Sequence, residues 1–252
     1  MEPLMELRHG TKTIIRPDGM SKHVIQDVTF RIYPKEILGV VGRSGAGKST
    51  LARSMIRLTD MTEGTLWFQG QNITKLQGKA LRPFYKHVQM VFQSPQESFD
   101  PHHTLGYSIA EQLRNQGIKE DKRRRRVQQI MEQCGLDGKT AACYPHEVSG
   151  GQCQRAAIAR ALIGSPDVLI CDEITSALDT ITQQQIITLL RQCNTQRGMA
   201  CVFICHNLAL AQQFCDRLFI MHEGRIVEDG KTADVLRHPK SDYTKELIEA
   251  VL

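Results

Sequence analysis

Residues 42–49 read Gly-Arg-Ser-Gly-Ala-Gly-Lys-Ser, and this stretch decides the fold. It fits the pattern G-x-x-x-x-G-K-[ST] and follows the apolar run Ile37–Val41, while Leu51, Met55 and Ile56 come after it at helical spacing. Glycines at these positions let backbone N–H groups surround phosphate groups, and the N-terminus of the following helix adds positive potential. The order of strand, loop and helix therefore predicts a nucleotide-binding loop, here called the phosphate loop.

Two side chains of the phosphate loop have a predicted chemical role. We expect Lys48 to reach the β and γ phosphates of a nucleotide and Ser49 to supply an oxygen to Mg²⁺. This stretch therefore predicts that the chain binds a nucleotide and Mg²⁺, and the family resemblance given below implies that the nucleotide is ATP. The residues predicted to bind them here are Gly42, Arg43, Ser44, Gly45, Ala46, Gly47, Lys48, Ser49 and Thr50.

A second stretch, Val168–Cys171, is an apolar run that ends in the acidic pair Asp172 and Glu173. Nucleotide hydrolases with a phosphate loop use an aspartate of this kind to hold Mg²⁺ beside the phosphates. We assign that role to Asp172, and we expect Glu173 to polarise the attacking water as a general base. The competing interpretation is that the two acids only cap a buried strand, and the neighbouring motifs argue against it.

A third stretch, Ser149-Gly150-Gly151-Gln152, has the chemistry of a further anion site. A serine N-cap followed by two glycines opens a helix whose backbone N–H groups can hold a phosphate. The competing interpretation is a plain turn that caps a helix and binds nothing.

The hydrophobic pattern around these motifs predicts an α/β fold. Val28, Phe30 and Ile32 alternate with polar residues as in a half-exposed strand, and residues up to about position 92 form a β-rich lobe. A helical insert follows from Ser94 to about position 145. Beyond it, helices alternate with buried strands, which indicates a parallel sheet, and the chain continues into a hairpin that turns at Glu223-Gly224.

The composition is that of an ordinary globular protein, with 252 residues, 41% of them hydrophobic and 23% charged. Much of the net charge of +5 comes from the run Lys122–Arg126. That run favours a solvated helix face, with a membrane surface or nucleic acid as the minority interpretation.

No stretch reaches the roughly 18 consecutive apolar residues of a membrane span, and the opening MEPLMELRHG does not have the order of a secretory signal. The eight scattered cysteines indicate reduced, buried thiols, so we expect a cytosolic location.

The three motifs in this order resemble the ABC transporter ATPases, whose signature S-G-G-Q-x-Q-R is matched by residues 149–155. The resemblance implies an ABC ATPase domain of the P-loop NTPase class over residues 1–252, an α/β fold with an N-terminal antiparallel β lobe and a helical insert. The implied division is a nucleotide-binding core at 1–93 and 156–230, a helical subdomain at 94–155 and a C-terminal tail at 231–252.

The resemblance also implies roles for residues outside the three motifs. Gln93 matches a glutamine that contacts Mg²⁺ and the attacking water, and His206 matches a histidine that contacts the γ phosphate. Ser176–Asp179 resembles the segment that links two ATP sites, each formed by the phosphate loop of one subunit and the signature of another. The implied catalytic residues are Lys48, Gln93, Glu173 and His206. The implied ligands of Mg²⁺ are Ser49, Gln93 and Asp172. The signature residues implied to bind ATP are Ser149, Gly150, Gly151 and Gln152.

Two further stretches resemble one branch of this family, the importers of oligopeptides, dipeptides and nickel. They are residues 89–101 and the ending His238-Pro239 with Asp242–Leu247. Peptide-importing members usually continue beyond this point, so the end at Leu252 favours nickel or metal-chelate importers. The resemblance implies a subunit that binds and hydrolyses ATP to energise import of nickel, metal chelates or peptides. The alternative is an ABC-type clamp on nucleic acid or ribosomes, for which the sequence shows neither long coiled coils nor a second ATPase domain.

The implied partners are a second ATPase subunit, identical or homologous, two transmembrane permease subunits and, indirectly, a substrate-binding protein. No nucleic acid is expected as a partner. The implied location is peripheral, at the cytoplasmic face of the membrane.

Some positions depart from the family pattern. The window Arg8–Thr13 lacks the aromatic residue that stacks on adenine in relatives, so either His9 stacks more weakly or base selectivity is relaxed. Val148, Ile174 and Asn207 stand where relatives usually carry leucine, proline and aspartate. None of these changes removes a group that handles phosphate, water or metal, and we expect an intact catalytic site.

Overall fold

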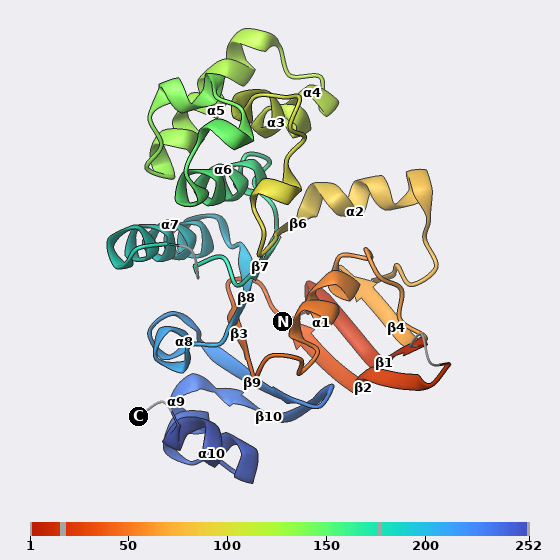
Figure 1. Cartoon of the computed structure of the whole chain (residues 1–252). Helices are drawn as coiled ribbons and strands as arrows, with labels where there is room; N and C mark the ends of the chain where they lie inside the picture. The colour runs from red at the N-terminus through yellow and green to blue at the C-terminus, as the bar shows by residue number, and fades with distance from the viewer. Residues whose placement is uncertain (1, 16–18, 176–177, 251–252) are drawn as a thin grey trace. The chain divides into compact units, whose positions relative to one another are not determined.

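The computed structural model describes residues 2–15, 19–175 and 178–250, which form two compact units (Figure 1). The first unit combines Met1–Tyr85 with Ala200–Leu252, and the second is Lys86–Met199. Among the described residues, no helix is both long and apolar enough to cross a lipid bilayer. The division of the chain into core, insert and tail stays a prediction.

The first unit contains an antiparallel sheet with the strand order β2-β1-β4-β5. Along β2, Val28, Phe30 and Ile32 are buried while the residues between them are exposed, which confirms the predicted half-exposed strand. The antiparallel lobe expected near the N-terminus is therefore confirmed. Its strands are β1 (Met5–Ile15), β2 (Ser21–Ile32), β4 (Glu63–Phe68) and β5 (Gln71–Asn72).

Strand β1 was missed by the hydrophobic pattern. Its pairing with β2 shifts register at three places between Leu7 and Thr13, and His9 has a φ of 52°. Each shift moves the following side chains to the other face of the sheet, so the alternation that marks a strand is interrupted.

A second group of strands in the first unit is built around β3 (Ile37–Val41). Strand β3 lies between β8 (Ala200–Cys205) and β9 (Arg217–His222) and is parallel to both, while β10 (Arg225–Lys231) is antiparallel to β9. All residues of β3 and β8 are buried, as continuous apolar runs in parallel sheets are. The predicted hairpin turn at Glu223-Gly224 is confirmed, and both residues have positive φ, 45° and 80°.

The helices of the first unit cover these strands. The predicted helix after His206 is α8, which packs on β3 and β8 and brings Phe214 against Phe203 with ring centroids 5.1 Å apart. Full burial of each ring contributes about 1.5–3 kcal/mol to folding. The helices are α1 (Lys48–Met55), the 3₁₀ turn η1 (Gly78–Leu81), α2 (Arg82–His87), which continues into the second unit, α8 (Leu208–Phe214), α9 (Thr232–Arg237) and α10 (Asp242–Glu249).

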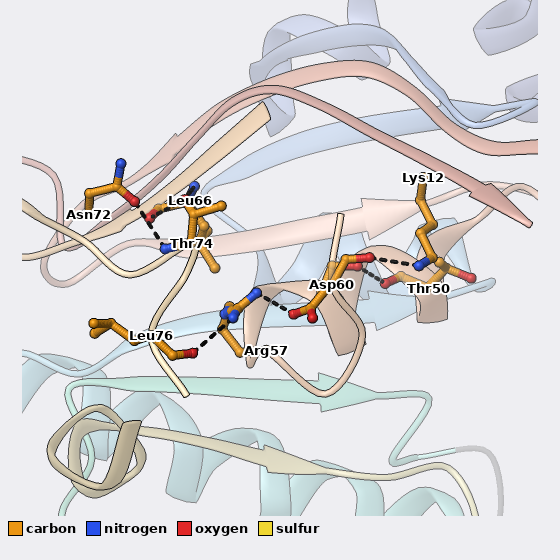
Figure 2. A network of polar contacts seen from close by, with 9 residues as sticks. Lys12, Thr50, Arg57, Asp60, Leu66, Asn72, Thr74 and Leu76 are labelled. Carbon is orange, nitrogen blue, oxygen red and sulfur yellow. Dashed lines mark hydrogen bonds and ion pairs between the residues drawn. The ribbon is translucent and has the colours of Figure 1, made fainter. Parts of the chain in front are cut away.

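Polar contacts fix the segment that follows α1 to its surroundings in the first unit (Figure 2). The guanidinium of Arg57, whose side chain is 6% exposed, pairs with the carboxylate of Asp60 and donates to the carbonyl of Leu76 at 3.0 Å. Lys12 of β1 donates to the carbonyl of Asp60 at 2.7 Å. The helix that follows the phosphate loop is therefore anchored at its far end as well.

The second unit contains a parallel strand pair, β6 (Val88–Val91) and β7 (Val168–Asp172), in which Val91 pairs with Cys171. Helix α5 buries Val127, Ile130 and Met131, as its spacing predicts. The helices are α3 (Leu105–Ile109), α4 (Glu111–Asn115), α5 (Glu120–Gln133), α6 (Gly150–Leu162) and α7 (Thr180–Arg197), with the 3₁₀ turns η2 (Gln96–Ser98), η3 (Gly138–Ala142) and η4 (Pro145–Glu147). The α/β class expected from the sequence is confirmed in both units.

Candidate functional site

The phosphate loop connects the end of β3 to the start of α1, and two of its glycines are required by their surroundings. A Cβ atom on Gly42 would lie 2.2 Å from the carbonyl oxygen of Met221. A Cβ atom on Gly47, which has a φ of 100°, would lie 2.6 Å from the carbonyl oxygen of Val24. A side chain at either position would push the loop away from β9 or β2, so these glycines set the path of the loop.

Backbone hydrogen bonds hold the rest of the phosphate loop. Gly224, in the turn between β9 and β10, donates its N–H to the carbonyl of Ala46 at 3.0 Å. Within the loop, Ala46 donates to Arg43 at 3.2 Å. The loop is thus held in its conformation by strands distant in the sequence.

Lys48 is held inside the curve of this loop. Its side chain is buried, and its Nζ donates to the carbonyls of Gly42 at 2.8 Å and Arg43 at 3.1 Å. An ammonium held there, at the N-terminus of α1, produces a positive potential that suits phosphate oxygens. Ser49 and Thr50 follow in the first turn of the helix, as the motif predicts.

His206 leaves the sheet of the first unit at the same edge as the phosphate loop. Val41, the last residue of β3, pairs with Cys205, the last residue of β8. Because the two strands are parallel, the residues that follow them emerge together at the carboxyl edge, where α/β proteins bind ligands. Asn207 caps α8 by accepting from the N–H of Leu210 at 3.0 Å, so asparagine serves as the cap at this position.

The second unit brings Gln93 and Glu173 together in the same way. Pairing of Val91 with Cys171 places the ends of β6 and β7 side by side. The amide Nε2 of Gln93 donates to the carboxylate of Glu173 at 2.8 Å. Gln93 and Glu173 are 80 positions apart in the sequence, and both are predicted to act on the attacking water. In the structure their side chains are in direct contact.

The acidic pair at the end of β7 is divided between two environments. Asp172 is 2% exposed, whereas Glu173 is partly exposed. Glu173 has a φ of 50°, a left-handed conformation that is uncommon for residues other than glycine and that occurs with strain at functional sites. Ile174, where relatives usually carry proline, is buried in the apolar core.

Ser149 and Gln152 form a capping box at the start of α6. The Oγ of Ser149 accepts from the N–H of Gln152 at 3.3 Å, and Oε1 of Gln152 accepts from the N–H of Ser149 at 2.9 Å. Among the described residues outside its chain neighbours and the backbone of its own helix, no atom lies within 4 Å of a Cβ built on Gly150. The glycine is therefore not demanded by internal packing, and the start of α6 is open to approach.

Two predicted features, the segment that links two ATP sites and adenine stacking by His9, stay predictions. Ser176 and Ala177, in the segment expected to link two ATP sites, lie outside the described residues, while Asp179 caps α7. Hydrogen bonds from the backbone and hydroxyl of Thr182 lower the pKa of Asp179. The ring of His9 is hydrogen-bonded to Asp27 at 2.8 Å and is largely exposed, so adenine stacking by His9 stays a prediction.

The predicted site residues are distributed over both units. The phosphate loop and His206 belong to the first unit, and Gln93, Asp172, Glu173 and the residues 149–152 belong to the second. Sequence reasoning missed the residues that hold the loop in place, namely Val24, Met221 and Gly224, because their backbone atoms make these contacts. Only the glycine of the hairpin turn left a signal in the sequence.

Comparison with known proteins shows the family of this chain. The family model described as ABC transporter matches residues 25–176. The chain is 42% identical over 230 residues to the glutathione import ATP-binding protein GsiA of Salmonella typhimurium, which covers 91% of this chain and 37% of GsiA. It is 39% identical over 253 residues to the oligopeptide transport ATP-binding protein OppF of Bacillus subtilis, covering 99% of this chain and 83% of OppF. The chain thus spans little more than a third of the length of GsiA.

Two solved structures share the fold. The ATP-binding cassette MJ0796, solved as a dimer in a post-hydrolysis state bound to ADP and Pi, superposes with a TM-score of 0.86 at 27% identity, over 90% of this chain and 98% of MJ0796. The protein cbiO1 of Clostridium perfringens, part of the ABC transporter complex cbiONQ, superposes with a TM-score of 0.80 at 25% identity, over 100% of this chain and 95% of cbiO1.

Proposed function

The chain belongs to the ABC transporter family, and from that premise we propose that it is the ATP-binding and ATP-hydrolysing subunit of an importer for peptides or metal chelates. The observation that supports hydrolysis most directly is the 2.8 Å hydrogen bond between Gln93 and Glu173. A carboxylate and an amide in contact at a strand end are the groups needed to orient and deprotonate a water molecule.

In this proposal the phosphate loop binds the nucleotide. Its backbone N–H groups and the ammonium of Lys48 contact the phosphates, and His206 contacts the γ phosphate. Glu173 takes a proton from water as the water oxygen attacks the γ phosphorus, and ADP leaves with the electrons of the broken P–O bond. Gln93 orients the same water.

The proposed protein ligands of Mg²⁺ are Ser49, Gln93 and Asp172. Their hydroxyl, amide and carboxylate oxygens are the hard donors that this ion prefers, so the donor set fits. When bound, Mg²⁺ neutralises negative charge on the phosphates.

A dimer is part of the proposal. Ser149, Gly150, Gly151 and Gln152 of one subunit would contact ATP held by the phosphate loop of the other. The open start of α6 and the dimeric structure of the similar cassette MJ0796 support this arrangement. The second subunit is either identical or homologous to this chain.

The partners and cargo follow from the relatives. We propose attachment at the cytoplasmic face of a membrane to two permease subunits, with cargo delivered by a substrate-binding protein. The named sequence relatives handle oligopeptides and glutathione, which favours a peptide-type cargo, and the nickel prediction finds no support in their names. A clamp on nucleic acid or ribosomes is not favoured, because these relatives are importer subunits.

The experiment that tests this function is purification of the chain with the proteins bound to it in its native membrane. Mass spectrometry should identify two multi-span proteins, and ATPase activity should rise with peptides more than with nickel chelates. A Glu173→Gln chain purified in parallel should retain the partners and lose the activity. Recovery of ribosomes or DNA-bound proteins in place of membrane proteins would contradict the importer.

A further inference from the structure

The C-terminal helix α10 reaches the phosphate loop through one side chain. The backbone N–H of Arg43, the second residue of the loop, donates to the hydroxyl oxygen of Tyr243 at 3.0 Å. The two residues are 200 positions apart in the sequence but lie in the same unit. The guanidinium of Arg43 also lies over the ring of Tyr243, 5.8 Å from its centroid, at the outer limit of a cation–π contact.

The ring of Tyr243 is supported from the other side by His222. The two rings are stacked, with centroids 4.0 Å apart and planes inclined by 28°. His222 ends β9, directly after Met221, whose carbonyl touches the base of the loop at Gly42. The same strand end therefore positions both the loop and the tyrosine that contacts it.

The start of α10 is also fixed. The carboxylate of Glu228, a buried residue of β10, accepts from the N–H groups of Lys240 at 2.9 Å and Ser241 at 3.2 Å. These two residues directly precede α10, so Tyr243 has little freedom to move away from the loop.

The hydrogen bond from Arg43 to Tyr243 acts on the peptide group that also holds Lys48. The carbonyl of Gly42 and the N–H of Arg43 belong to one planar peptide unit, in which they point in opposite directions. The carbonyl accepts from Nζ of Lys48 at 2.8 Å, and the N–H donates to Tyr243. Tyr243 and Lys48 are therefore hydrogen-bonded to opposite sides of one peptide, so that a rotation of this peptide would move an acceptor of the Lys48 ammonium.

We propose that Tyr243 is a positioning residue for nucleotide binding, which acts through the peptide between Gly42 and Arg43 on Lys48. This inference rests on the proposed function, because it assigns a role toward the nucleotide of that same site. It gives the C-terminal segment a part in ATP affinity, although none of its residues is assigned to the phosphate site.

The test compares Tyr243→Phe with the wild-type chain by titration calorimetry with MgATP. Phenylalanine keeps the ring stacked on His222 and removes only the acceptor for the Arg43 N–H. We expect the Kd for ATP to rise about three- to tenfold, as the loss of one hydrogen bond predicts. The matched control is Tyr33→Phe, which removes a hydroxyl that interacts with Arg31 in the same unit and should leave the Kd unchanged.

Steady-state kinetics separates positioning from simple support of the fold. The KM for ATP should rise with Kd while kcat stays within about twofold, because Tyr243 does not contact the reacting atoms. A second variant, His222→Leu, removes the stacking partner and should shift Kd in the same direction by a smaller factor. An unchanged Kd in both variants, with or without a lower Tm, would overturn the inference and leave the proposed function intact. A wild-type chain that binds no ATP would overturn both.

Discussion

The two units of the molecule present their proposed catalytic groups in different ways. In the first unit, Lys48 is buried and its ammonium is held by two backbone carbonyls of a loop that packs against β2 and β9. In the second unit, Gln93 is exposed, Glu173 is partly exposed, and one side-chain hydrogen bond joins them. The difference teaches that, in the proposed function, the group for nucleotide binding lies in a packed interior, whereas the two groups proposed to act on water lie closer to the surface.

The largest effect is expected for Glu173→Gln, which tests the second unit. The amide cannot take a proton from water, so kcat should fall by about 10²- to 10³-fold while the Kd for ATP stays within about twofold. Single-turnover hydrolysis and calorimetric titration measure the two quantities. The control Glu147→Gln changes a carboxylate that accepts from the N–H of Tyr144 in the same unit, and kcat should hardly change. Turnover near the wild-type value in Glu173→Gln would remove this residue from the role of base.

A smaller effect is expected for Lys48→Met in the first unit, and it concerns ATP binding instead of turnover. Loss of the ammonium removes charge-assisted contacts to phosphate, so the Kd for ATP should rise by about 10- to 100-fold. The control Lys12→Met removes an ammonium that donates to the carbonyl of Asp60, and its Kd should match the wild type. Normal ATP affinity in Lys48→Met would show that nucleotide binding does not depend on this residue of the first unit.

A pair of glycine substitutions compares the packing of the two units. Gly47→Ala places a Cβ 2.6 Å from the carbonyl of Val24 at a φ of 100°, and the free energy of unfolding should fall by about 1–3 kcal/mol. Gly150→Ala meets no described atom within 4 Å and should leave the stability unchanged or raise it by up to about 1 kcal/mol. Urea denaturation of both variants measures the difference. Equal stabilities would show that the phosphate loop is not held as tightly as its contacts indicate.

The smallest perturbation is thiol labelling, which probes the second unit without changing its sequence. Burial raises the pKa of Cys134 to about 12 and that of Cys153 to about 11, so both thiols stay protonated at pH 8. Among the described residues, Cys143 is the one cysteine that is not buried. Mass spectrometry of the native protein at pH 8 should therefore find rapid labelling at Cys143. Equally fast labelling of Cys134 would show that the interior of this unit opens readily.

Prediction from the sequence was most complete where a pattern is local. The residues around β3, β8 and α5 carry a continuous apolar run or a helical spacing, and the structure forms strands and a helix there. It was least complete at β1, where register shifts interrupt the alternation. The N-cap predicted at Ser149 is confirmed, whereas the caps made by Gln152 and Asn207 were not predicted.

The sequence by itself determined the fold class, the family and the identity of the proposed phosphate, water and metal groups. The phosphate loop and the acidic pair follow from short runs in a strand and helix context, whereas the family and the roles of Gln93 and His206 follow from a resemblance of motifs. The tertiary structure alone decided that Gln93 contacts Glu173, that Val24 and Met221 demand glycine in the loop, and that Tyr243 holds the Arg43 peptide. These contacts join residues up to 200 positions apart. Many of them are made by backbone atoms, which every residue type carries, so they leave no local pattern to read.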